Sequence, residues 1–189
     1  MKRPLIFVSW LGVFAGLGGG LSYVHGQKGA ETALTTVVLL WCGMLIAISL
    51  TEAWVKFKTK LLERHVAFDV GRNVFDALNS LELAVACTLV GLKVAFPHVD
   101  FPPALIACLG MLAVQVVYLT PKLELRAVHA MCELLANRKH ATKVEEESFK
   151  EFRAITALSS NPSSTLHVVY VVFEFVKVAL LLSVGVVVK

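Results

Sequence analysis

Charged side chains are scarce in this chain: only 17% of its 189 residues are Asp, Glu, Lys or Arg, whereas 57% are hydrophobic. The mean hydropathy is +0.72, which excludes an ordinary soluble domain. Residues 32–51 contain no Asp, Glu, Lys, Arg or His. A helix of about 20 such residues spans about 30 Å, the thickness of the hydrocarbon core of a bilayer. The scarcity of charge therefore predicts a multi-pass integral membrane protein.

Catalytic fingerprints are also missing. The sequence has no HExxH, GxSxG, P-loop or dinucleotide-binding motif. The serine pairs at 159–160 and 163–164 are better explained by a turn that starts a helix than by a nucleophile. A haem would need two facing histidines, but His65, His129 and His167 lie outside the apolar segments or at their edges. We expect no enzyme activity, no cofactor and no metal.

Cysteine and net charge exclude further classes of protein. The four cysteines form no CxxC pair, and Cys42, Cys87 and Cys108 lie within apolar segments. Such thiols behave as small hydrophobic groups, so neither a disulfide framework nor a metal site is expected. The net charge of +4 comes without a face rich in both basic and aromatic residues, which argues against nucleic acid as a partner.

Four apolar segments follow the N-terminal region, at 33–54, 74–96, 104–119 and 166–188. An isolated strand in lipid would leave its backbone groups unpaired, so each segment is predicted to be a helix. The third segment is expected to continue as a helix to about residue 137, and a short amphipathic helix is expected near 145–158. The fold class is therefore an all-α, polytopic transmembrane helical bundle, with residues 31–189 forming the four-helix domain and a charged loop at 122–162.

Residues 1–30 allow two interpretations. Lys2 and Arg3 precede an apolar run that ends near Val24, which is typical of a cleaved leader and equally of a first transmembrane helix. Glycines at positions 16, 18, 19 and 20 weaken a helix, but they also allow a neighbouring helix to approach closely.

Basic residues are concentrated between particular segments. The loops at 55–72 and 120–165 carry most of the Lys and Arg residues, whereas residues 96–119 carry none. The positive-inside rule therefore places the N-terminus and both basic loops on the inner face of the membrane. Four residues just after the first apolar segment are expected to contact anionic lipid headgroups: Lys56, Lys58, Lys60 and Arg64.

Polar residues inside the segments are functional candidates because they are costly in lipid. Asp76, Asn79 and Glu82 share one helix face, and Arg72 lies one turn before Asp76 and is expected to pair with it. A matching stripe occurs in the last segment. Together these residues predict a polar seam in the inner half of the bundle, formed by Glu52, Arg72, Asp76, Asn79, Glu82, Gln115, His167, Tyr170, Glu174 and Lys177. The seam is either a pathway for a proton, ion or small solute, or a set of interhelical bonds that fix helix register.

Several local patterns resemble the transmembrane protein 205-like family. They are TEAWVKFK at 51–58, DVGRNVF at 69–75, LTPKL at 119–123 and SSNPSSTLH at 159–167. The resemblance covers residues 33–188 and implies a four-helix membrane domain without an established reaction; some members of the family are linked to drug resistance or trafficking. The N-terminal region and the long charged loop depart from the family's layout, which leaves open a specialised subunit of an organelle membrane assembly.

The leading functional hypothesis from the sequence is a non-enzymatic accessory or scaffold subunit of a membrane assembly. Its partners would be the lipid bilayer and either other membrane subunits or further copies of the chain. The alternative is a small transporter or channel component that uses Glu82, Glu174 and Lys177, the deepest members of the seam.

Overall fold

The fold consists entirely of helices in the residues that the computed structural model describes, 3–138 and 142–187. The elements are α1 (Arg3–Leu45), the π-helix η1 (Ile46–Glu52), α2 (Ala53–Lys58), α3 (Arg64–Ala95), α4 (Pro103–Val114), the π-helix η2 (Gln115–Leu119), α5 (Thr120–Ala136), α6 (Lys143–Ala157) and α7 (Thr165–Val187). The all-α class predicted from the sequence is confirmed.

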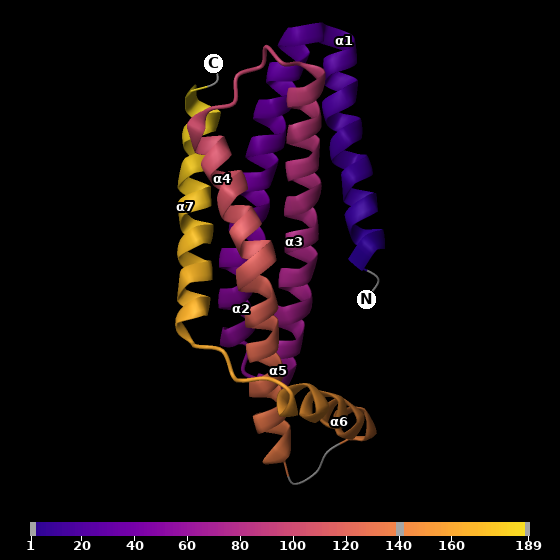
Figure 1. Cartoon of the computed structure of the whole chain (residues 1–189), viewed down its shortest axis with the longest axis vertical. Helices are drawn as coiled ribbons and strands as arrows, with labels where there is room; N and C mark the ends of the chain where they lie inside the picture. Colours follow the sequence, from indigo (N-terminus) through magenta and orange to yellow (C-terminus); the bar gives the residue numbers. More distant parts are fainter. Residues whose placement is uncertain (1–2, 139–141, 188–189) are drawn as a thin grey trace.

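Four helical stretches are long and apolar enough to cross a membrane: Gly26–Lys56, Arg64–Ala95, Pro103–Ala136 and Thr165–Gly185. They run up and down in turn, and α6 lies across one end of the bundle (Figure 1). We refer to this end as the α6 end. Both basic loops are located there, as the sequence predicts, because α2 and α5 each reach it.

The N-terminal region forms a helical limb that folds back on the bundle. The chain turns at Gly26, whose φ of 59° and ψ of −134° interrupt α1. This positive φ suits glycine, which has no Cβ to clash. The limb lies beside α3 (Figure 1), and a Cβ on Gly18 would lie 3.5 Å from Thr88 Cγ2. Gly18 therefore faces α3 at ordinary van der Waals distance, while Gly16, Gly19 and Gly20 face open space.

An apolar core joins α1, α3, α4 and α7. Trp41, Leu34, Leu89 and Leu181 are among its fully buried side chains. At the end opposite α6, Lys93 Nζ donates to the carbonyl oxygens of Pro97 and Val99 at 2.9 and 2.7 Å, which closes the hairpin between α3 and α4. The packing places the polar residues of α3 and α7 opposite one another.

The expected helices beyond the membrane segments are present. The helix that begins at Pro103 continues through η2 and α5 to Ala136. Thr142 begins α6 with a capping box, in which its hydroxyl accepts from the Glu145 N–H and the Glu145 carboxylate accepts from the Thr142 N–H. Phe152 of α6 packs with Val128, Met131 and Leu135 of α5. Ser163 Oγ accepts from the Thr165 N–H at the start of α7.

Candidate functional site: a buried ionic layer

Three charged side chains meet in the middle of the bundle. Lys177 Nζ of α7 donates to Glu82 Oε1 of α3 at 2.5 Å and lies 3.0 Å from Glu174 Oε1. Their side chains are 0–2% exposed. We call Glu82, Glu174 and Lys177 the ionic layer. Because i and i+3 lie on one helix face, Glu174 and Lys177 share a face of α7, from which Lys177 reaches Glu82 of α3.

Uncharged donors from three further segments surround the ionic layer. Trp41 Nε1 of α1 donates to Glu82 Oε1 at 2.9 Å. Gln115 Nε2 donates to Glu174 Oε1 at 2.7 Å, and Ser49 Oγ donates to Glu174 Oε2 at 2.9 Å. The four stretches that are long and apolar enough to cross a membrane therefore all contribute a group to one hydrogen-bonded cluster.

Charge and hydrogen bonding in this layer are incomplete. Two carboxylates face one ammonium group, which leaves one excess negative charge when all three are ionised. In the part of the chain that the structure describes, two buried side-chain oxygens lack a hydrogen-bond partner, Glu82 Oε2 and Gln115 Oε1. An unpaired buried charge is costly. The layer therefore has the chemistry of a site that can take up one proton.

Both π-helices lie at the ionic layer. Ser49 belongs to η1, and Gln115 opens η2. A π-turn widens the helix locally, and such turns are frequent at functional sites. Here they are the elements that present the Ser49 hydroxyl and the Gln115 amide to Glu174.

A neutral polar layer lies between the ionic layer and the α6 end. Asn79 Nδ2 donates to Thr120 Oγ1 at 3.1 Å, and Tyr170 OH donates to Asn79 Oδ1 at 3.4 Å. Phe75 packs edge-on against the Tyr170 ring, with the ring centroids 5.4 Å apart. These residues separate the ionic layer from the space beyond them.

A cavity of about 380 Å³ occupies that space. Tyr170 and Thr120 form part of its wall, so it ends at the neutral polar layer. Its lining is mostly apolar, with six acidic or basic side chains: Lys56, Arg72, Asp76, Glu124, Arg126 and His167. The cavity therefore extends from the α6 end to the neutral polar layer, which lies directly below Glu82. We also call it the vestibule, and its lining carries charges of both signs.

The predicted seam residues occupy three levels. Asn79, Glu82, Gln115, Tyr170, Glu174 and Lys177 meet in the two buried layers, and Arg72, Asp76 and His167 line the cavity. The side chain of Glu52 lies outside the described part of the structure. Arg72 Nη2 pairs with Asp69 at 2.9 Å, three residues earlier on α3; its pairing with Asp76 stays a prediction.

Trp41 and Ser49 belong to the cluster but were not predicted. Trp41 is fully buried, and its indole N–H would be unsatisfied in lipid without Glu82. That requirement was a usable signal in the sequence. Ser49 gave no such signal, because a serine in a membrane helix can bond to its own backbone and the π-turn that aims it at Glu174 has no motif.

The predicted headgroup residues divide into two groups. Lys58, Lys60 and Arg64 are exposed, and Lys58 Nζ lies 4.1 Å from the ring centroid of Trp54. Lys56 is 7% exposed and lines the cavity. A Cβ on Gly71 would lie 2.5 Å from Lys56 Nζ, so the glycine makes room for the ammonium group. Lys56 therefore faces the cavity rather than the outer surface, and its contact with a lipid headgroup stays a prediction.

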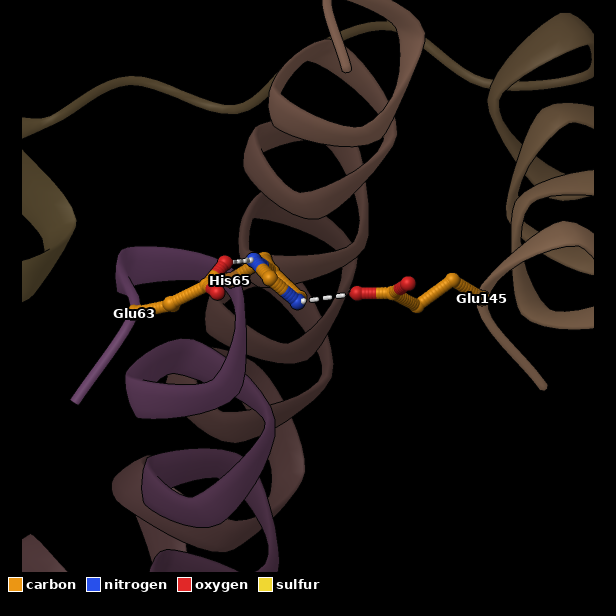
Figure 2. A group of neighbouring side chains, drawn as sticks. All are labelled: Glu63, His65 and Glu145. Carbon is orange, nitrogen blue, oxygen red and sulfur yellow. Dashed lines mark ion pairs between the residues drawn. The ribbon is translucent and has the colours of Figure 1, made fainter. Parts of the chain in front are cut away.

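A second ionic cluster ties α6 to the bundle. Figure 2 shows His65 between two carboxylates, Glu63 beside the start of α3 and Glu145 in α6. Their distances to His65 are 3.5 and 3.0 Å. Arg138 Nη1 lies 2.6 Å from Glu63 Oε2 and 2.5 Å from Glu145 Oε1. The residue types suit a metal ion, but the guanidinium of Arg138 already supplies the positive charge there.

Glu145 titrates differently from an ordinary exposed carboxyl group. Hydrogen bonds from Thr142, chiefly from its backbone N–H, lower the pKa of Glu145 below its usual 4.5, and the Arg138 charge adds to the effect. The carboxylate that caps α6 is therefore the same one that binds Arg138.

The chain matches no protein-family model, no curated protein and no solved structure.

Proposed function

We propose that this multi-pass membrane protein is a small transporter or channel component that binds and moves a proton through the ionic layer. The observation that carries the proposal is the excess negative charge of Glu82, Glu174 and Lys177, together with the unpartnered Glu82 Oε2. Ionisable groups within a membrane are expensive, and they mark proton relays in pumps and transporters.

Proton uptake follows from the electrostatics of the layer. In a poorly solvated interior, opposite charges attract strongly, and one carboxylate can pair with Lys177. The second carboxylate has no separate counter-ion there, because Glu174 and Glu82 share one ammonium group. A proton on either carboxyl group would leave a neutral ion pair, and a protonated carboxyl group also gains a donor hydrogen.

The cavity gives the ionic layer a route of access from the α6 end, which supports transport from that end. The cavity reaches Tyr170 and Thr120, which bond to Asn79, and Asn79 lies one helical turn before Glu82 on α3. On the other side of the ionic layer, the core residues include Leu34, Leu89, Leu105 and Leu181. In this conformation the ionic layer is approached by a cavity from the α6 end and is covered by apolar side chains on its other side. Moving a proton through the bundle would require these apolar side chains to separate.

An accessory or scaffold subunit, the function that the sequence favours, is the alternative. In that case the ionic layer would serve only to fix the register of the four spans. The two functions differ in one expectation. If the charges of the ionic layer only fix helix register, replacing them with neutral side chains of the same shape would keep full function.

Proton flux into liposomes tests the proposal. Purified protein would be reconstituted with a pH dye inside, and a potassium diffusion potential would drive protons inward. We expect flux above that of protein-free liposomes, and its loss in Glu82→Gln. This variant is suitable because Lys177 keeps Glu174 as a partner at 3.0 Å, so no buried charge is left unpaired.

Glu151→Gln on the exposed face of α6 is the matched control, and its flux should equal that of the native protein. Flux no higher than in protein-free liposomes, or unchanged in Glu82→Gln, would contradict the proposal. Co-purification of a second membrane chain in fixed ratio, without flux, would favour the accessory subunit.

A further inference from the structure

We propose that the cavity at the α6 end binds the headgroup phosphate of an acidic phospholipid. The inference does not depend on proton transport, because it concerns the vestibule and its basic side chains rather than the ionic layer. Three observations carry it: the charge of the cavity, the position of Lys56, and the level of the cavity in the bundle.

The cavity combines positive charge with apolar walls. Three basic residues, Lys56, Arg72 and Arg126, line it with two acidic ones, Asp76 and Glu124, so basic side chains outnumber acidic ones in the lining. Phe68, Phe75 and Leu123 contribute apolar wall. A monoanionic amphiphile, with one acidic group and an apolar body, is complementary to such a lining.

Lys56 is held in place to face this space. Its side chain is 7% exposed, its Nζ lies 6.0 Å from the Phe75 ring centroid, and it packs against Gly71. A neighbouring cavity shares Lys56, Ala67, Phe68 and Ala130 and is also lined by Lys60, Arg64 and Glu133. Positive charge therefore continues from the buried ammonium group to the exposed basic residues at the α6 end.

The position of the cavity along the bundle favours a lipid as the ligand. Trp54 and Tyr118 are exposed aromatic residues, and each carries a lysine over its ring: Lys58 at 4.1 Å and Lys122 at 3.9 Å. Aromatic and basic residues of this kind mark the headgroup region of a bilayer. Lys56 and Thr120, which line the cavity, lie two residues from Trp54 and Tyr118 in the sequence. The cavity is thus located where phosphate groups lie, and basic pockets between spans bind acidic lipids.

Lipid retention measures this binding directly. The protein would be reconstituted in nanodiscs of equal parts phosphatidylcholine and phosphatidylglycerol, re-extracted gently and analysed by native mass spectrometry. We expect phosphatidylglycerol to be retained in preference to phosphatidylcholine. Lys56→Met should lower that preference about fivefold, since one basic residue near a lipid surface contributes about 1 kcal/mol. Lys150→Met, at an exposed position on α6, should leave it unchanged.

Arg126→Gln provides a second variant in case Lys56→Met does not fold, and its preference should fall similarly. Equal retention of the two lipids, or equal effects of Lys56→Met and Lys150→Met, would overturn the proposal. Inorganic phosphate and glycerol 3-phosphate, added separately as competitors, identify the source of the bound anion. Displacement of the lipid by either soluble anion would overturn the assignment to a phospholipid in favour of a free phosphate site.

Discussion

Lys177 and Glu82 form an ion pair between α7 and α3 with both side chains fully buried. The pair lies within a cluster to which all four long apolar stretches contribute, so the consequences of changing it extend beyond two helices. Breaking such a pair differs from neutralising all of it, because a lone buried charge has no compensation.

Lys177→Met should destabilise the protein strongly. It leaves Glu82 and Glu174 buried without a counter-ion, and removing one partner of a buried pair costs about 3–5 kcal/mol. Thermal unfolding in detergent micelles measures the effect, with Lys150→Met as the exposed control. The triple variant Glu82→Gln, Glu174→Gln, Lys177→Met should recover most of the loss. A triple variant as unstable as the single one would contradict the role of charge.

Trp41→Phe should lower stability by about 1–3 kcal/mol, the cost of leaving a buried acceptor with one donor fewer. The indole N–H donates to Glu82 Oε1 at 2.9 Å, and phenylalanine keeps most of the apolar contact. Trp10→Phe is the matched control, because Trp10 is 39% exposed. Equal unfolding midpoints for the two variants would mean that the indole hydrogen bond contributes nothing.

Gly18→Leu should loosen the N-terminal limb of α1, whereas Gly19→Leu should not. Both changes raise helix propensity equally, but only Gly18 faces Thr88 and Leu92 of α3. Hydrogen exchange of the amides in residues 7–20 reports the opening of the limb. Faster exchange in Gly19→Leu than in Gly18→Leu would contradict the packing described for α1.

Acid should release α6 from α5. The pKa of Glu145 is lower in the folded state than its usual 4.5. Its contribution is therefore fully present above pH 4.5 and is lost as the pH falls through the lowered folded value. Limited proteolysis within residues 142–157 measures the release, with an acid-active protease at low pH and a neutral protease for the variants at neutral pH. Glu145→Gln should raise cleavage at neutral pH, and the exposed Glu147→Gln should not.

The sequence predicted the order of the helices well. The length of an apolar segment and the placement of charge indicate directly whether a segment faces lipid or water. It also predicted that Asn79, Glu82, Tyr170 and Glu174 share a polar region, since their spacing places each pair on one helix face. That spacing pattern does not specify which side chains pair with one another. Arg72 pairs with Asp69, a partner three residues away that the pattern did not single out. Lys56 faces the cavity, where it packs against Gly71 of α3. The π-turns that aim Ser49 and Gln115 also depend on tertiary packing.

The continuous helical stretch from Pro103 to Ala136 connects the ionic layer to α6. Its 34 residues extend about 50 Å, which exceeds the hydrocarbon thickness by about 20 Å. Within it, Gln115 donates to Glu174, and its α5 part packs against α6. A force applied to α6 from the aqueous side would therefore be passed along α5 and through η2 to Gln115, which bonds to Glu174.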